Sequence, residues 1–537
     1  MRLIIKDYLL QLKEKDELDL LLCDLIFQMG YVTDNRPETG NRQYGVDIRA
    51  HNEDSVFLFV VKQGNMNRRN WDTDPNSVRQ SLNEVFDCYL NFFPLNENQK
   101  KLHIIVATNG MMDEAVAPNW EGYIRQHTAW NGVPVLFCFW NIDVITDHIQ
   151  RLLFDERIFN TDMRRLLRRA LYYIGEPDYP QKYYEQIIDD YLNSIKLDAS
   201  AKEQKKNLSG MFLASQMIAY YAADEHFYSI AIHVSECLII RYWQFLLTNK
   251  LFEKEFYVDW LNHFLSMYEK WNKKYYFEVK SCCETKSCMP PYNGVEKRVK
   301  IYEILAHLIT FAYYLSCKKY DIDHLRGRIY NTIIKLINNY PQAYYPPYDE
   351  DIGIISMLFR FLNKTGNHTE TEILMRNICT HQVLYYRMFH KYPSPIDSFK
   401  DAVDIDMGTS PSDYNSTAFW GVMLEWVVLM DARDIYDKIL YQFLSDDIKD
   451  VTKCTWYLRS NEENYLYEKN TMFNAGDGVS IETPEKYEDL EKEIECLQNQ
   501  YSTELFSFDE YSFPALEFIL ARYFKQFIRR IAEKGCE

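Results

Sequence analysis

Asp47 and Lys62 are the residues of this 537-residue chain whose types and placement could do chemistry together. They lie in residues 45–63, GVDIRAHNEDSVFLFVVKQ, which predict two β-strands joined by a polar hairpin. Carboxylates hold Mg²⁺ or Mn²⁺, which prefer oxygen ligands. Such a metal polarises a phosphate and activates a water, and a lysine at the same point stabilises the developing negative charge. The pair therefore predicts metal-dependent hydrolysis of phosphodiester bonds.

The hairpin decides which side chains meet. Side chains alternate along a strand, so Val60 and Lys62 share one face of the second strand, whereas Phe59 and Val61 point the other way. If the two strands pair, Asp47 can lie beside Lys62. Each residue alone has a simpler interpretation, Asp47 as a turn or cap residue and Lys62 as a solvated strand end.

The elements around this hairpin predict an α/β domain. Apolar residues at three- and four-residue spacing predict a helix over 1–29, and Gly30 ends it. Two strands follow, at about 44–50 and 55–62. After them the pattern predicts, in order, a helix over 76–93, a buried strand over 102–108, a helix over 113–127, a strand over 133–139 and a helix over 142–153. Strands that alternate with helices imply a mixed, largely parallel sheet covered on both faces.

These segments resemble a known family. DLLLCDLIFQMGY (19–31), GVDI (45–48), FLFVVKQ (57–63), IIVATNG (104–110) and VPVLFCFWNIDVI (133–145) are similar in order and spacing to the PD-(D/E)xK restriction-endonuclease-like fold, in the style of Mrr-like restriction endonucleases. The resemblance implies a nuclease domain over 1–156 that uses Mg²⁺ or Mn²⁺ on DNA. It also implies that Asp47 binds the metal, Lys62 is the catalytic lysine and Asp19 is the helix carboxylate.

Val60 departs from that family, which has Glu, Asp or Gln two residues before the lysine. Valine cannot ligate a metal, so either another acid replaces it or the site is inactive. Glu84 and Asp87 on the following helix are the candidates, and Glu84 is taken as the second metal ligand beside Asp47. An inactive nuclease-like domain that serves for binding is the alternative.

Polar residues follow the lysine directly. Gln63, Arg68 and Arg69 could contact a nucleic-acid backbone, and a solvated loop explains them equally well. The four arginines of 164–169 could bind phosphates, although arginines on helices usually pair with acids.

The rest of the chain, 157–537, predicts an all-α region that recognises a partner or a trigger. Its helix pairs could stack as an α-solenoid, but no fixed repeat length is found. Loops at 281–297 and 391–416 are candidate breaks between two subdomains.

Composition limits the function further. The net charge of −18 argues against a broad nucleic-acid coat, though not against one local basic patch. No signal peptide and no run of about 18 apolar residues is found, which predicts a cytoplasmic protein with no membrane contact. No P-loop motif is present, so any energy-coupled sensor or ATPase would be a separate protein partner. A homodimer would be consistent with cutting both DNA strands.

Two functions remain open. The first is a metal-dependent DNA nuclease of bacterial restriction or antiphage defence, with an RNA-directed nuclease as a weaker variant. The second is a catalytically inactive adaptor that binds protein or nucleic acid through its helical region. They differ in whether Asp47, Lys62 and a third carboxylate converge.

Overall fold

The computed structural model describes residues 2–35, 44–74, 76–95, 100–152, 159, 161–176, 181–286, 289, 294–318, 324–390, 398–408, 415–458, 463–467, 476–501 and 506–524. The chain divides into two compact units, Met1–Val234 and Ser235–Glu537. The domain boundary expected at 156 lies inside the first unit, because α1 (Arg2–Leu9) packs against α9 (Ala201–Asp224). The sheet domain and the first helices after it therefore form one compact unit.

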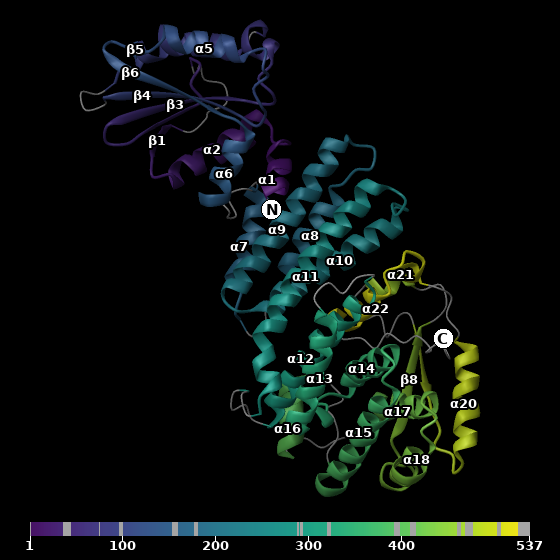
Figure 1. Cartoon of the computed structure of the whole chain (residues 1–537). Helices are drawn as coiled ribbons and strands as arrows, with labels where there is room; N and C mark the ends of the chain where they lie inside the picture. Colours follow the sequence, from purple (N-terminus) through teal and green to yellow (C-terminus); the bar gives the residue numbers. More distant parts are fainter. Residues whose placement is uncertain are drawn as a thin grey trace. The chain divides into compact units, whose positions relative to one another are not determined.

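A mixed six-stranded sheet organises the first unit (Figure 1). Its strands are β1 (Val32–Asn35), β2 (Ile48–His51), β3 (Ser55–Lys62), β4 (Lys101–Thr108), β5 (Ala129–Trp130) and β6 (Val133–Trp140). The spatial order is β1-β2-β3-β4-β6-β5. Strands β3, β4 and β6 run parallel, and the remaining neighbours pair antiparallel. The mixed sheet and the predicted hairpin are therefore confirmed, with Ile48 opposite Phe59 in the register.

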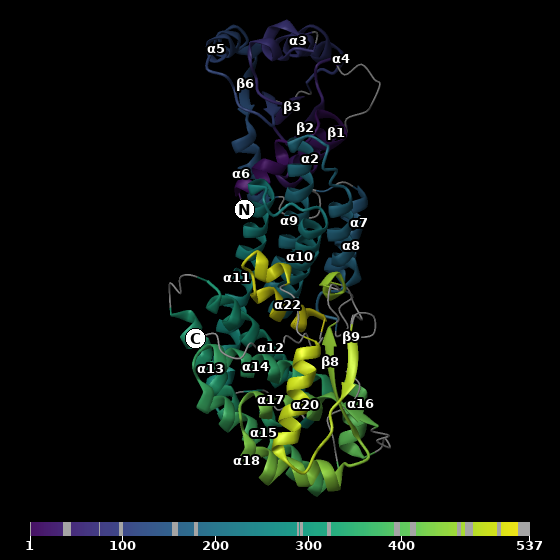
Figure 2. The ribbon, with the colours of Figure 1, turned by 90° about the vertical axis from the view of Figure 1, so that its right-hand side faces the viewer.

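Helices cover both faces of this sheet, with α3 and α5 on one side and α2 and α6 on the other (Figures 1 and 2). Beyond α1 and α9, the α-helices of this unit are α2 (Asp19–Gln28), α3 (Val78–Glu84), α4 (Leu90–Phe92), α5 (Ala117–Gln126), α6 (Ile142–Leu152), α7 (Thr161–Tyr172) and α8 (Lys182–Asn193). Three π-helical turns lie at Glu14–Leu18, Arg69–Thr73 and Val85–Tyr89. Covered faces explain why β3 is buried along almost its whole length.

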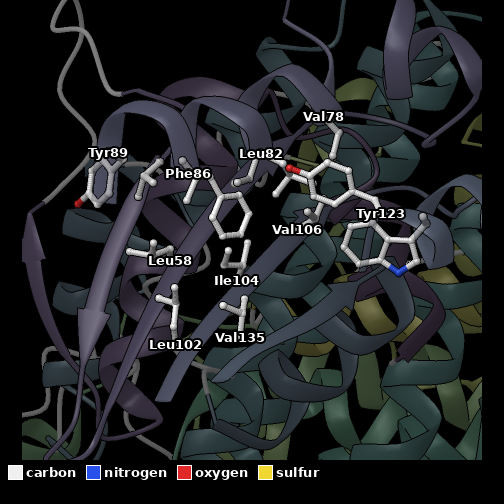
Figure 3. Close-up of a cluster of buried hydrophobic side chains, with 14 of the residues drawn as sticks. Leu58, Val78, Leu82, Phe86, Tyr89, Leu102, Ile104, Val106, Tyr123 and Val135 are labelled. Atoms are coloured by element: carbon white, nitrogen blue, oxygen red, sulfur yellow. The ribbon is translucent and has the colours of Figure 1, made fainter. Parts of the chain in front are cut away.

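The core on the α3 side is a cluster of aliphatic and aromatic side chains (Figure 3). Leu58, Ile104 and Val135 extend from the strands toward Leu82 and Phe86 of the covering helix. Val60 belongs to the same cluster and is 0% exposed. The position at which the resembling family carries an acid is therefore part of the hydrophobic core.

The first 35 residues differ from the prediction in two ways. The single helix expected over 1–29 is two helices, α1 and α2, separated by extended backbone at Lys13 and the π-turn Glu14–Leu18. Apolar spacing continues across this break, so periodicity alone does not detect it. Gly30 does end α2, with φ +86°, but residues 32–35 then form the edge strand β1. The segment between Asn35 and Tyr44 is polar and contains Pro37 and Gly40, which predicts a loop, and most of it lies outside the described residues.

The second unit is mainly helical. Its helices are α10 (Tyr228–Thr248, which begins in the first unit), α11 (Glu255–Glu284), α12 (Gly294–Ser316), α13 (Leu325–Asn339), α14 (Ile352–Lys364), α15 (His368–Phe389), α16 (Phe399–Met407), α17 (Ala418–Leu429), α18 (Arg433–Ile435), α20 (Tyr487–Gln500), α21 (Ser507–Glu510) and α22 (Ala515–Phe524). Short 3₁₀ turns lie at Pro341–Tyr344, Asp349–Asp351 and Glu463–Tyr467, and π-turns lie at Tyr436–Leu440 and Phe443–Asp447.

The expectation of an all-α region is wrong in one place. A three-stranded sheet is formed by β7 (Ser416–Thr417), β8 (Thr452–Leu458) and β9 (Gly476–Ser480), in that spatial order. Strand β8 packs on α17, so the sheet is part of the fold of this unit. Pairing between segments distant in sequence creates these short strands, which helical periodicity cannot reveal.

Buried ion pairs connect the last described helix, α22, to neighbouring helices. Arg360 of α14 pairs with Glu517 through two hydrogen bonds of 2.6 and 3.0 Å. Arg522 donates from Nε to Glu236 of α10 at 2.8 Å, and its Nη1 lies 3.2 Å from Nε2 of His307 on α12. These contacts tie four helices of the unit together.

One helix is relevant to the expectation that the chain contains no membrane-spanning segment. Among the described residues, α10 is long and apolar enough by length and composition to cross a membrane, with a mean hydropathy of 1.3. Of that window, 67% is buried within the protein.

Candidate active site

Asp47 lies one residue before β2, where its backbone continues the hairpin. Its N–H donates to the carbonyl of Phe59 at 2.9 Å, and its Oδ2 accepts the N–H of Val61 at 2.7 Å. Among the described residues, none donates a hydrogen bond to Oδ1 of Asp47. The hairpin therefore holds the carboxylate against β3 by one oxygen and leaves the other available to a ligand.

Gly45 makes this placement possible. Its φ of +79° lies in the left-handed region, and a Cβ added there would stand 2.1 Å from the carbonyl oxygen of Ser81. Only glycine combines this conformation with so close an approach to α3. The glycine of GVDI thus brings the chain under α3 two residues before the carboxylate.

Lys62 ends β3 and faces Glu14 of the π-turn. Its Nζ lies 3.9 Å from Oε1 of Glu14, and both side chains are largely shielded, at 20% and 33% exposed. The other oxygen of Glu14 accepts the N–H of Gln63 at 3.3 Å. The Gln63 amide in turn donates to the carbonyl of Leu12 at 3.0 Å. The strand end and the turn that carries Glu14 are therefore joined by three contacts.

The π-turn itself is held by Glu17. The Glu17 carboxylate accepts the N–H of Lys13 at 2.8 Å and pairs with Lys206 of α9 at 2.6 Å. Lys205 of the same helix pairs with Asp7 of α1 at 2.9 Å. Helix α9, from beyond the predicted nuclease domain, thus contacts the segment that presents Glu14 to the site.

Asn109 locks the neighbouring strand ends. Its Oδ1 accepts the N–H of Gly64 at 2.7 Å, and its Nδ2 donates to the carbonyls of Leu9 and Leu12, both at 2.9 Å. A Cβ on Gly110 would lie 2.3 Å from Gly64, so the two loops touch backbone to backbone. The carboxyl ends of β3 and β4 and the end of α1 therefore form one rigid edge, where ligands of such sheets tend to bind.

The Asp47 carboxyl shows that the acids of this edge act on one another. Burial raises its pKa to about 6, the hydrogen bond from Val61 and the charge of Lys62 lower it, and Glu14 and Asp19 raise it. Asp19 is the first residue of α2 and is 6% exposed. A pKa raised by burial beside other acids is typical of carboxylates that share a functional site.

Of the other three predicted catalytic residues, Lys62 and Asp19 act electrostatically on the carboxyl of Asp47, and Glu84 is not among the groups that shift the pKa of Asp47. Glu84 ends α3, and its carboxylate accepts a hydrogen bond of 3.5 Å from Gln80 of the same helix. Asp87, the other acid considered there, is exposed on the turn that follows.

The three predicted nucleic-acid contacts, Gln63, Arg68 and Arg69, also differ in their surroundings. Gln63 is engaged with Leu12, and Arg69 pairs with Asp74 at 2.9 Å. Arg68 is exposed, and no ion pair to it is found in the part of the chain that the structure describes.

Glu14 is the site residue that sequence reasoning missed. It stands in the acidic run EKDELD directly before the apolar stretch of α2, and that run was the available signal. Its approach to Lys62 requires the break between α1 and α2, which the spacing of apolar residues conceals.

The carboxylates suit a hard divalent cation in kind, because Mg²⁺ is usually bound by one or two carboxylates, with waters and substrate phosphate completing its shell. Asp47 offers a free oxygen, and Glu14 and Asp19 act on it electrostatically. Over the described residues, no group of three or more His, Cys, Asp or Glu side chains is arranged to hold a metal by itself. A metal here would therefore depend on a small number of protein ligands.

Comparisons of the chain with protein-family models, with curated proteins and with solved structures found no match.

Proposed function

We propose that the first unit is a metal-dependent nuclease that cleaves phosphodiester bonds of DNA, with a PD-(D/E)xK-like site. The observation that carries the proposal is the approach of Lys62 to Glu14 beside Asp47. Glu14 supplies the acid that Val60 lacks, so the role is moved from the strand to the π-turn. Asp47 and Glu14 would hold Mg²⁺ or Mn²⁺, which would polarise the scissile phosphate and lower the pKa of a water.

The chain's own residues contribute the rest. Lys62 orients the attacking water and stabilises negative charge on the phosphate, while its pairing with Glu14 holds its ammonium group in place. Asp19, buried at the start of α2, adds negative potential around Asp47 and so favours a cation there. Burial of Asp47 excludes water from one side of the site, which strengthens these electrostatic effects.

The test is cleavage of supercoiled plasmid and of linear DNA with Mg²⁺ or Mn²⁺ by the full chain. Wild type is compared with Asp47→Ala and Lys62→Ala, and thermal unfolding verifies that each variant is folded. Loss of cutting in both folded variants supports the proposal. Equal cutting by wild type and both variants would assign the activity to another site or to a contaminant.

A second candidate is an inactive nuclease-like adaptor, favoured by one specific observation. Val60 stands at the family's second acid position and is 0% exposed inside the hydrophobic cluster, so this position supplies no metal ligand. Calorimetric titration of the folded chain with Mg²⁺ and Mn²⁺ separates the two functions. The adaptor predicts neither metal binding nor cutting, whereas metal binding without cutting indicates a nuclease that awaits an activating partner.

The second unit would then recognise a partner or trigger, as a component of restriction or antiphage defence in the cytoplasm. The chain contains no P-loop motif, so a sensor or ATPase would be a separate protein. Affinity purification of the Lys62→Ala chain with and without phage challenge tests for such a partner.

A further inference from the structure

Three exposed cations lie in the two chain segments that adjoin the acidic site, namely the segment of the π-turn that carries Glu14 and the loop that follows β3. Lys13 and Lys15 flank Glu14 in sequence, and Arg68 follows Lys62 by six residues. All three side chains are exposed, and the structure gives none of them an ion pair within the part of the chain that it describes. We call Lys13, Lys15 and Arg68 the cationic rim.

The contacts of Gln63 fix the two lysines at the site. Gln63 donates from its backbone to Glu14 and from its side chain to Leu12, so the segment between them lies against the end of β3. The Glu17 carboxylate caps the N–H of Lys13 and fixes the turn from the other side. Lys13 and Lys15 therefore lie on either side of the residue that faces Lys62.

Arg68 is carried by a loop that is anchored rather than loose. Trp71 is 1% exposed and packs in the core cluster between Trp120 and Tyr123. The loop is closed by a 2.7 Å hydrogen bond from Asn70 to the carbonyl of Asn65. Asn65 in turn accepts the N–H of Met111 at 2.9 Å. An anchored loop presents the Arg68 charge with a small loss of conformational entropy on binding.

Other cations of the same unit form ion pairs, unlike those of the cationic rim. Arg69 pairs with Asp74, Arg79 with Asp72 at 3.1 Å, and Lys206 with Glu17. The exposed cations of the rim thus differ from these nearby cations, which form ion pairs. In a chain of net charge −18, this is a local patch of the kind that a polyanion requires.

We propose that the cationic rim binds the phosphate backbone of the nucleic acid on both sides of the scissile phosphate. The proposal rests on the nuclease function above and adds how that site holds its substrate. The acids of the site are negative and repel the phosphates of the nucleic acid. A single cation among these carboxylates would not attract the phosphates strongly enough to offset that repulsion. Cations placed around the acids offset this repulsion for the flanking phosphates and leave the carboxylates free for a metal.

The experiment measures binding apart from cleavage. Labelled duplex DNA is titrated with the full-length Lys62→Ala chain in Mg²⁺ at several NaCl concentrations, and fluorescence anisotropy gives the affinity. The titration is then repeated with a Lys62→Ala chain that also carries the triple substitution Lys13→Gln, Lys15→Gln and Arg68→Gln. Each lost phosphate contact lowers the slope of log affinity against log salt by about 0.9. We expect a clear fall in slope and a loss of affinity of about tenfold or more at low salt.

The matched control removes three exposed cations of the same unit elsewhere, with Arg125→Gln at the end of α5 and with Lys196→Gln and Lys202→Gln around the start of α9. Its slope and affinity should stay close to those of the parent. An equal fall in both triple variants, or no fall in the rim variant, would overturn the proposal. Flotation with phosphatidylserine vesicles is run in parallel, and rim-dependent vesicle binding without DNA binding would assign the rim to a membrane surface instead.

These outcomes separate the rim from the nuclease. DNA binding that depends on the rim, in a chain that neither binds metal nor cuts, would refute the proposed activity and leave the rim in place. Cutting that depends on Asp47 and Lys62 while the rim variant binds normally would refute the rim alone.

Discussion

Lys62 Nζ lies 3.9 Å from Oε1 of Glu14, although 48 positions and three secondary structure elements, α2, β1 and β2, separate the two residues in the chain. The pairing joins the end of β3 to the π-turn before α2 and places Glu14 among the groups that act on the Asp47 carboxyl. It also identifies an acid that can replace the one absent at Val60. The first prediction follows from this replacement.

Glu14→Gln should reduce DNA cleavage by about 100-fold or more, because it removes a negative metal ligand and the partner of Lys62 while retaining the shape of the side chain. Glu84→Gln should leave cleavage within about twofold, since Glu84 is bonded to Gln80 on α3. Single-turnover rates of both variants at saturating metal provide the measurement. The reverse pattern, with loss in Glu84→Gln alone, would return the second acid to α3.

Val60→Glu should destabilise the first unit instead of completing the family's motif. The side chain of Val60 is 0% exposed in the hydrophobic cluster, and an unpaired carboxylate there should cost roughly 3 kcal/mol or more. Val60→Ala, which only removes two methyl groups, should cost about 2 kcal/mol. Urea unfolding measures both. A stable Val60→Glu chain that cuts DNA where wild type does not would instead show that the natural site is inactive.

Stability should depend on pH through Asp47. Its folded pKa, raised to about 6 by burial, lies above the ordinary value of 3.8, so ionisation costs more in the folded chain. The stability that this group contributes is complete below about pH 4 and is lost as the pH rises through 6. Asp47→Asn should therefore raise Tm relative to wild type by more at pH 8 than at pH 5. The same shift at both pH values would contradict the raised pKa.

The affinity for a divalent metal should change with pH in the opposite direction to the stability. Only the ionised Asp47 carboxylate attracts a cation strongly, so calorimetric affinity for Mg²⁺ should increase as the pH rises through about 6. The dependence should disappear in Asp47→Asn, together with most of the affinity. An unchanged dependence in that variant would assign the titration to a different group.

Arg522→Leu should destabilise the second unit by about 3–5 kcal/mol, since it leaves the fully buried Glu236 without its cation. Adding Glu236→Gln should recover part of this loss, because the second substitution removes the uncompensated charge. Chemical unfolding of the wild type, the single variant and the double variant measures these changes in the free energy of unfolding. A double variant that is less stable than Arg522→Leu would show that Glu236 is stabilised without Arg522.

The strands and most helices of the first unit follow from local patterns. Residues 55–62 and 102–108 are apolar runs bounded by polar residues, and the structure forms β3 and β4 there. Gly30 has a positive φ and ends α2 as predicted, whereas Gly45, which the prediction placed in a strand, has a positive φ in the turn before β2. The hairpin register, which brings Asp47 to Val61, requires only the pairing of neighbouring segments.

The second unit shows where local patterns fail. Strands β8 and β9 pair over a separation of about twenty residues, and β7 joins them from before α17. Such pairing depends on which segments the fold brings together, and a strand of two residues, such as β7, has no periodicity to read.

The sequence by itself determined the α/β character of the first unit, the hairpin and the proximity of Asp47 to Lys62, because each depends on side-chain alternation and hydrogen bonds between adjacent segments. Only the tertiary structure decided which acid joins them. Glu14 reaches Lys62 because α1 ends at Leu9, Asn109 holds the carbonyls of Leu9 and Leu12, and the π-turn is capped by Glu17. These contacts join residues up to 100 positions apart, and packing rather than local propensity selects them.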